Sequence, residues 1–260
     1  MQDTGRQKNY LTEQYILAAL MAAATILSWL WLWLMPMESH AAGHGGGHGN
    51  PALTGMGSLF IMWLVMMVAM MLPIVFPWAM AFSRTSMQKY EGPDKKPAAF
   101  KTSGFLAGYF SIWILFSIAG AAGQWLLREK AGISAESGMA GSLSGIVIMI
   151  VTGLYQWSPL KASCLKHCRS PLLFFLTSWK EGKSGAFIMG FKHGLFCLGC
   201  CWALMTLTFF FGVMSLGWMA IITLLLIIEK MTPAGNHASR VSGAAMVAYG
   251  LYLLIRALSL

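Results

Sequence analysis

Seven long runs of apolar residues alternate with shorter polar segments along the chain. The runs cover residues 15–36, 56–81, 104–127, 142–160, 187–211, 214–230 and 241–258. Each run is apolar around the whole helical circumference, and about 20 such residues span the hydrocarbon core of a bilayer. Because every backbone amide in hydrocarbon needs an internal partner, we expect each run to form a helix. The pattern predicts an all-α, polytopic transmembrane helical bundle with about seven spans.

The polar segments divide the chain into a short tail, residues 1–14, and a single transmembrane domain, residues 15–260. Residues 37–55 form a loop rich in glycine and histidine, which we expect on the outer side. The apolar piece that begins at Pro171 is too short to cross, so we expect it at the membrane interface or tucked into the bundle. The first run is longer than the core of a signal peptide, about 7–15 residues, which favours a retained anchor.

Composition agrees with a membrane protein, because 57% of the residues are hydrophobic and 10% are charged. The net charge of +9 could suggest nucleic acid, so the distribution of the 18 Lys and Arg residues matters. With a cytoplasmic N-terminus, the outer side receives only Arg128, Lys130 and Arg256. This bias follows the positive-inside rule. We therefore predict a multi-pass protein of the bacterial cytoplasmic (inner) membrane, surrounded by lipid and without a nucleic-acid partner.

Cysteines are concentrated in the run 187–211, which contains Cys197, Cys200 and Cys201. On an α-helix, with Cys197 at zero, Cys200 lies at about −60°, Cys201 at about +40° and His193 at about −40°. Four potential ligands thus share one narrow face in the predicted cytoplasmic half of the helix. A lone membrane cysteine is usually a small packing residue. Three with a histidine on one face favour a metal or redox site.

The other two cysteines, Cys164 and Cys168, flank His167 in the segment CLKHC. Their spacing of four residues places both thiols on one side of a helix, next to the inner surface. Cytosolic reductants keep such thiols reduced, so metal or redox chemistry is favoured over a structural disulfide. The spacings match no zinc-finger, ferredoxin or c-type haem signature.

Methionine is a further soft ligand, and the chain has 20. In the run 56–81, Met62, Met66 and Met70 recur every four residues, and Met67 with Met71 makes a parallel row. Soft thiolates and thioethers favour Cu(I), while Cys with His also suits zinc or another transition metal. Met rows more often belong to a core or face lipid. We predict copper as the metal, with Met66, Met70 and Met71 among its candidate ligands.

The outer loop contains His40, His44 and His48 at regular spacing among glycines. Short His-rich tracts of this kind bind divalent transition metals, and we consider the loop a possible outer metal collector. A soluble linker is the alternative interpretation.

Two adjacent charges, Glu229 and Lys230, close the run 214–230 at its inner end. Charged residues at such a position often extend to the membrane surface. Alternatively, the carboxylate pairs with Lys161, Lys192 or Arg169, or supports the thiol cluster from the second layer of contacts.

Four segments also resemble a family of uncharacterised bacterial integral membrane proteins that is labelled as predicted metal-binding. They are WLVMMVAMMLP, YQWSPLKASCLKHCRSP, GLFCLGCCWALM and the Glu229–Lys230 pair, within residues 55–260. The resemblance marks as family-pattern residues Cys164, Cys168, Cys197, Cys200, Cys201, Met70, Met71 and Pro73. The His-rich loop lies outside the matching segments.

Three functions fit these features. The first is transport, delivery or storage of a soft metal through a Cys/His/Met site, with a metallochaperone or membrane metalloenzyme subunits as partners. The second is thiol–disulfide or electron transfer through the cysteine pairs. The third is an accessory subunit of a larger membrane complex. The sequence contains no hydrolase elbow, P-loop, dinucleotide fingerprint or HExxH motif, so we assign no catalytic residue and expect a non-enzymatic role.

Overall fold

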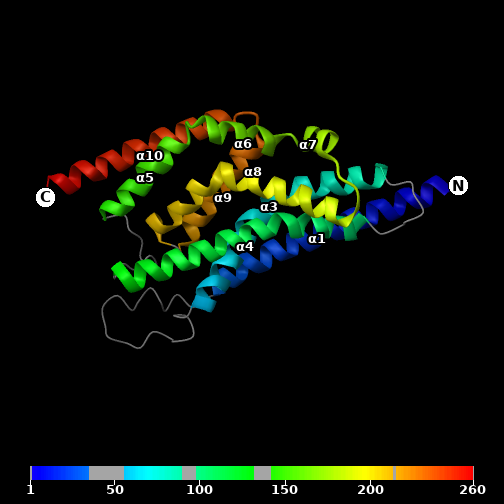
Figure 1. Cartoon of the computed structure of the whole chain (residues 1–260), viewed down its shortest axis with the longest axis horizontal. Coiled ribbons are helices and arrows are strands. Elements are labelled where there is room, and N and C mark those ends of the chain that lie inside the picture. Colours follow the sequence, from blue (N-terminus) through cyan, green and yellow to red (C-terminus); the bar gives the residue numbers. More distant parts are fainter. Residues whose placement is uncertain (1, 35–55, 90–97, 132–141, 213–214, 260) are drawn as a thin grey trace.

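The computed structural model describes residues 2–34, 56–89, 98–131, 142–212 and 215–259, and these residues form an elongated bundle of helices (Figure 1). The helices are α1 (Gln2–Leu34), α3 (Met56–Lys89), α4 (Ala98–Ala131), α5 (Leu143–Tyr155), α6 (Pro159–Arg169), α7 (Pro171–Ser178), α8 (Gly182–Phe211), α9 (Leu216–Met231) and α10 (Gly235–Leu258). No strand occurs within these ranges, which confirms the all-α prediction for this part of the chain. The predicted outer loop 37–55 falls outside the described residues.

Six of the seven apolar runs each fall on one helix and the run 142–160 is divided between two, but not every helix is long enough to cross a membrane. Among the described residues, five helices are long and apolar enough to span a membrane: α1, α3, α4, α8 and α10. The bent pair α5–α6 makes a sixth if it is counted as one span. Helix α9 has 16 residues, fewer than the roughly 20 that a perpendicular span needs. The count of seven spans and the cytoplasmic N-terminus therefore stay predictions.

The break between α5 and α6 has a local cause in the sequence. The run predicted as 142–160 is divided, because α5 ends at Tyr155 and α6 starts at Pro159, bent by 63°. A proline disfavours helical geometry in the residue before it, and Ser158 is accordingly extended, with φ −66° and ψ 142°. The Ser158 hydroxyl then accepts a hydrogen bond from the Lys161 amide at 3.1 Å and caps α6.

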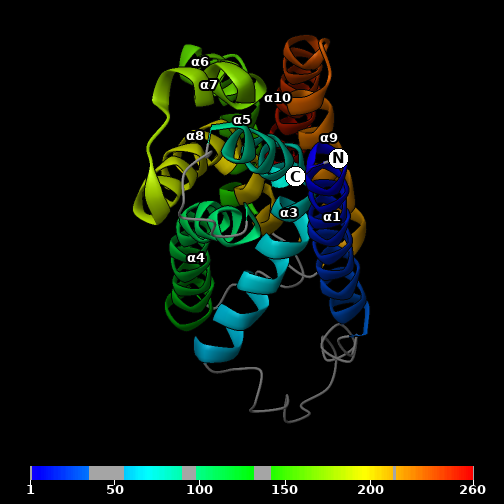
Figure 2. The same ribbon diagram turned by 90° about the vertical axis from the view of Figure 1, so that its right-hand side faces the viewer.

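The core is built around α3 and α8, with α4 packed closely on both (Figure 2). Glycines allow α4 and α8 to approach at backbone distance, because a Cβ on Gly108 or Gly190 would collide with main-chain atoms of the facing helix. From α3, the side chains of Trp63, Met66 and Met70 are almost fully buried.

The short helix α7 is packed into the bundle, one of the two placements expected for the Pro171-led piece. Phe175 is fully buried, and Phe174 and Phe175 both contact the Trp78 ring edge-on, with centroids 5.5 and 5.6 Å away. This packing holds the end of α6, with Cys168, against α3.

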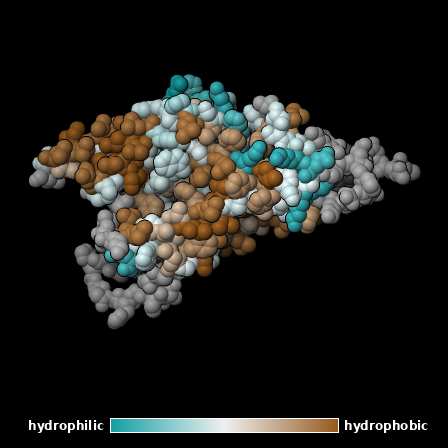
Figure 3. Space-filling view, viewed as in Figure 1, coloured by the Kyte–Doolittle hydropathy of each residue, from teal (hydrophilic) through white to brown (hydrophobic). Residues whose placement is uncertain are grey.

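The outward faces of α1 and α10 carry many exposed apolar side chains, including Tyr15, Leu20, Val241 and Ile255. Figure 3 shows hydrophobic surface over the part of the molecule where α5 and α10 lie, with hydrophilic residues gathered elsewhere. Such a surface suits lipid contact.

Candidate metal centre

A cavity of about 290 Å³ lies where α3, α6, α8 and α9 meet. It is lined by Ile74, Pro77, Trp78, Cys168, Arg169, Pro171, His193, Cys197, Lys230 and Met231. Two thiols and one imidazole from separate segments therefore border the same space. At its edge the Arg169 guanidinium donates hydrogen bonds to the Thr232 carbonyl and, at 3.3 Å, to Asn236 Oδ1, which ties α6 to the connection between α9 and α10.

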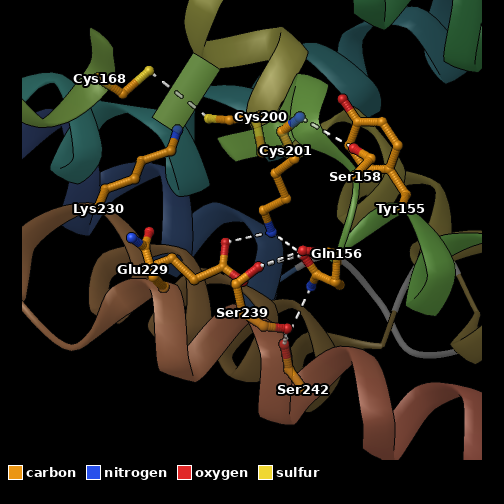
Figure 4. A network of polar contacts seen from close by, with 12 residues as sticks. Tyr155, Gln156, Ser158, Cys168, Cys200, Cys201, Glu229, Lys230, Ser239 and Ser242 are labelled. Atoms are coloured by element: carbon orange, nitrogen blue, oxygen red, sulfur yellow. Dashed lines mark hydrogen bonds and ion pairs between the residues drawn. The ribbon is translucent and has the colours of Figure 1, made fainter. Parts of the chain in front are cut away.

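The two cysteine segments converge at this cavity. Cys168 Sγ of α6 lies 3.8 Å from Cys200 Sγ of α8, although 32 residues separate them in sequence (Figure 4). Both side chains are buried, and all five cysteines are free thiols. The sequence predicted both cysteine segments near the inner surface, and in the structure Cys168 and Cys200 are in contact.

Cys197 is the sulfur with the most polar surroundings. Lys230 Nζ donates to Cys197 Sγ at 2.9 Å, and the Tyr109 hydroxyl lies 3.1 Å from the same atom. An ammonium and a phenol next to one sulfur stabilise its thiolate form. By contrast, the thiols of Cys200 and Cys201 donate to the Cys197 carbonyl oxygen, at 3.1 and 2.8 Å.

His193 adds an uncommitted nitrogen to the cavity wall. Its ring is 2% exposed and stacks on Trp78 with a centroid separation of 3.7 Å, while Nε2 has no hydrogen-bond partner among the described residues. A buried polar atom without a partner is costly and is a sign of a functional site. The Trp78 indole N–H donates to the Cys168 carbonyl at 3.0 Å, so the ring on which His193 stacks is also bonded to α6.

Several residues predicted as ligands lie away from the cavity. Cys164 is half-buried with its sulfur against Gly199, and His167 is exposed, with its ring stacked on Phe196 at 4.4 Å. The α3 methionines Met66, Met70 and Met71 are fully buried in the core. Helix α3 presents Ile74, Pro77 and Trp78 to the cavity instead. The predicted outer collector, His40, His44 and His48, lies outside the described residues.

The Glu229 carboxylate belongs to a neighbouring buried network (Figure 4). Its Oε2 pairs with Lys161 Nζ at 2.7 Å, and both side chains are 1% exposed. Lys161 also donates to Gln156 Oε1, which Ser239 contacts at 3.1 Å. Of the alternatives for Glu229, the pairing with Lys161 is confirmed, and extension to the membrane surface is wrong, since the carboxylate is directed inward.

These donors do not form a complete cage. Within the described residues, no group of three or more His, Cys, Asp or Glu side chains is arranged to hold a metal ion. The cavity instead offers two sulfurs, an imidazole nitrogen and an ammonium. This set suits a soft cation that accepts few ligands better than a four-coordinate structural zinc site.

Two residues of the site carry no signal in the sequence. Tyr109 is a single polar aromatic residue in a long apolar run, and Trp78 is one of 11 tryptophans. Neither has a spacing that distinguishes it from core residues. Their contacts with Cys197 and Cys168 arise only when α3, α4, α6 and α8 pack together.

Comparison with known proteins places these segments in a family. No curated protein and no solved structure matches the chain. A family model described as "PpoB2: Copper chaperone" matches residues 60–253. The match includes all five cysteines, His193 and the Glu229–Lys230 pair. Because it covers most of the sequence, the chain belongs to the PpoB2 copper chaperone family.

Proposed function

We propose that this protein is a membrane-embedded chaperone that binds Cu(I) between the thiolates of Cys168 and Cys197. The observation that carries the proposal is the meeting of these two cysteines, from α6 and α8, at one cavity with the unpartnered His193 Nε2. Membership of a copper chaperone family supports copper as the cargo.

The chemistry of the donors favours Cu(I) over zinc. Cu(I) is soft and is held well by two thiolates, whereas structural zinc takes four ligands. With no preformed group of three ligands among the described residues, a two-thiolate site is the arrangement the cavity supports. His193 Nε2 is available as an additional, weaker ligand, and Cys200 lies next to Cys168 for passing the ion along α8.

The proposal includes a location and a direction for the handover. The basic residues Lys166, Arg169 and Lys192 lie on α6 and α8 close in sequence to Cys168 and His193. By the positive-inside rule, this side of the protein faces the cytoplasm of a bacterium whose inner membrane holds the bundle. From this end Cu(I) would pass to a membrane metalloenzyme subunit. The outer loop with His40, His44 and His48 is the proposed collector, and the buried thioethers of Met66, Met70 and Met71 are the proposed path through α3 to the thiolate site.

Copper binding can be measured on detergent-purified protein under anaerobic conditions. We propose titration of Cu(I) against a chromogenic Cu(I) chelator, comparing wild type with Cys168→Ser, Cys197→Ser and Cys164→Ser. We expect one tightly bound Cu(I) in wild type and in Cys164→Ser, because Cys164 faces Gly199 rather than the cavity. Either of the other two variants should lose this binding.

The imidazole is tested separately with His193→Phe, which keeps a ring on Trp78 and removes the nitrogen. We expect a weaker but still stoichiometric Cu(I) complex. Equal binding by wild type and Cys168→Ser would contradict the two-thiolate site, and binding lost only in Cys164→Ser would move the site elsewhere.

Thiol–disulfide exchange is the second candidate function, favoured by the 3.8 Å approach of Cys168 and Cys200. It predicts that metal-free protein forms a reversible Cys168–Cys200 disulfide on mild oxidation, detectable by peptide mass spectrometry. If Cu(I) binding is absent and this disulfide forms readily, the redox function replaces the copper function.

A further inference from the structure

Lys230 places a buried positive charge directly against the sulfur cluster. Its side chain is 8% exposed, and its ammonium donates to Cys197 Sγ at 2.9 Å. The neighbouring carboxylate of Glu229 does not pair with Lys230, because its Oε2 lies 2.7 Å from Lys161 Nζ.

We infer that Lys230 is a specificity-determining residue, which makes the site selective for monovalent over divalent soft cations. Its ammonium sets the total charge of the site, which a monovalent ion brings to zero. This inference rests on the proposed copper function and deepens it. It concerns which ion the cavity accepts rather than whether it binds one.

The argument follows from the charges around the cavity. Lys161 and Glu229 cancel each other, and the Arg169 guanidinium at the cavity edge is half-buried and bonded to the Thr232 carbonyl and to Asn236. The buried fixed charge that remains beside the sulfurs is therefore the positive charge of Lys230. When Cys168 and Cys197 hold a cation both sulfurs are thiolates, and any thiol proton that they carried is released to water. With a monovalent cation the thiolates, the ammonium and the ion sum to zero. A divalent cation leaves one uncompensated positive charge, which a buried, low-dielectric site disfavours strongly.

The other two buried cysteines do not alter this sum. Cys200 and Cys201 donate their thiol protons to the Cys197 carbonyl, so this sum counts both as neutral thiols. The balance therefore depends on one residue, and a neutral side chain of similar length at position 230 should reverse it. Without the ammonium, a divalent cation neutralises the two thiolates, whereas a monovalent cation leaves a net charge of about −1.

The test uses Ag(I) and Cd(II), two soft ions that avoid the redox chemistry of copper. Dissociation constants for both are measured by competition titration on detergent-purified wild type and Lys230→Met. We expect the ratio of Ag(I) affinity to Cd(II) affinity to fall by about a hundredfold in Lys230→Met, the order expected for one charge lost within a few Å at an effective dielectric constant of about 20. Ag(I) binding should weaken, because its dithiolate complex is negative, whereas binding of Cd(II), whose complex is neutral, should change little.

Two variants serve as controls. Lys230→Arg keeps the charge and should keep the wild-type ratio. Lys192→Met removes an exposed positive charge from α8, where solvent screens it, and should also leave the ratio unchanged. If Lys230→Met does not yield a monodisperse protein, Lys230→Gln takes its place in the same comparison.

The outcomes separate this inference from the function on which it rests. If wild type binds neither Ag(I) nor Cu(I), the copper site itself is refuted. If wild type binds them and the neutral variant weakens both ions equally, or leaves the ratio unchanged, Lys230 has only a structural role and the charge-matching inference is overturned.

Discussion

Lys161 and Glu229 lie 68 residues apart in sequence and form a buried ion pair, with Nζ 2.7 Å from Oε2. The pair joins α6 to α9, the helices that carry Cys168 and Lys230 to the cavity. It therefore fixes the relative position of a proposed ligand and the charge next to it, and it leaves Lys230 to interact with sulfur.

Removing one partner of this pair should be costly. Glu229→Gln leaves the Lys161 ammonium buried without its counter-charge, and we expect a loss of about 3–5 kcal/mol in the free energy of unfolding. Chemical or thermal unfolding in detergent micelles measures the change.

The matched control removes both charges together. The double variant Lys161→Met/Glu229→Leu replaces the pair with apolar side chains, and we expect stability close to wild type. A single variant as stable as the double one would mean that the pair contributes nothing to joining α6 and α9.

The close contact of α4 with α8 depends on glycine. Gly190→Ala would drive a Cβ into the main chain of Phe105, so we expect a loss of about 1–3 kcal/mol from helix separation. Gly123→Ala is the control in α4, because nothing lies within 4 Å of its added Cβ. It should gain about 0.5–1 kcal/mol from helix propensity. Equal melting temperatures for the two variants would contradict this packing.

The hydroxyl of Tyr109 should contribute to metal binding through Cys197. Tyr109→Phe removes a contact of 3.1 Å with little change of shape, and we expect Cu(I) affinity to fall by about tenfold, as for one hydrogen bond to a charged acceptor. Chelator competition measures the affinity. Tyr249→Phe, at an exposed position on α10, is the control, and an equal effect of both changes would exclude a specific role for Tyr109.

Thiol reactivity should follow burial. Cys164 is half-buried, whereas Cys168 and Cys197 are 4% and 0% exposed. We expect a maleimide to label Cys164 first in folded, metal-free protein, and added Ag(I) to protect Cys168 and Cys197 during longer labelling. Peptide mass spectrometry identifies the labelled residues. Protection of Cys164 by the metal, with Cys168 and Cys197 still reactive, would contradict the proposed ligand pair.

Local features of the sequence were sufficient to predict the helices. The backbone amides of an apolar run in lipid find partners only within a helix, and every run is helical in the structure, with the run 142–160 divided between α5 and α6. The division of the run 142–160 also has a local signal in the sequence, because Pro159 disfavours helical geometry at Ser158 and Ser158 caps the start of α6. The single face shared by Cys197, Cys200, Cys201 and His193 follows from helical geometry alone, and all four are buried on α8.

Tertiary packing decided which of these residues face the cavity. Spacing treats Cys164 and Cys168 alike, but in the packed bundle Cys168 lines the cavity and Cys164 does not. The methionine rows of α3 and the cavity residues Pro77 and Trp78 belong to one helix, and only the packing of the other helices around α3 decides which of them line the cavity. Contacts such as Lys230 with Cys197, or Lys161 with Glu229, join residues far apart in the chain. Periodicity reports the faces of one helix, whereas a binding site depends on how several helices meet.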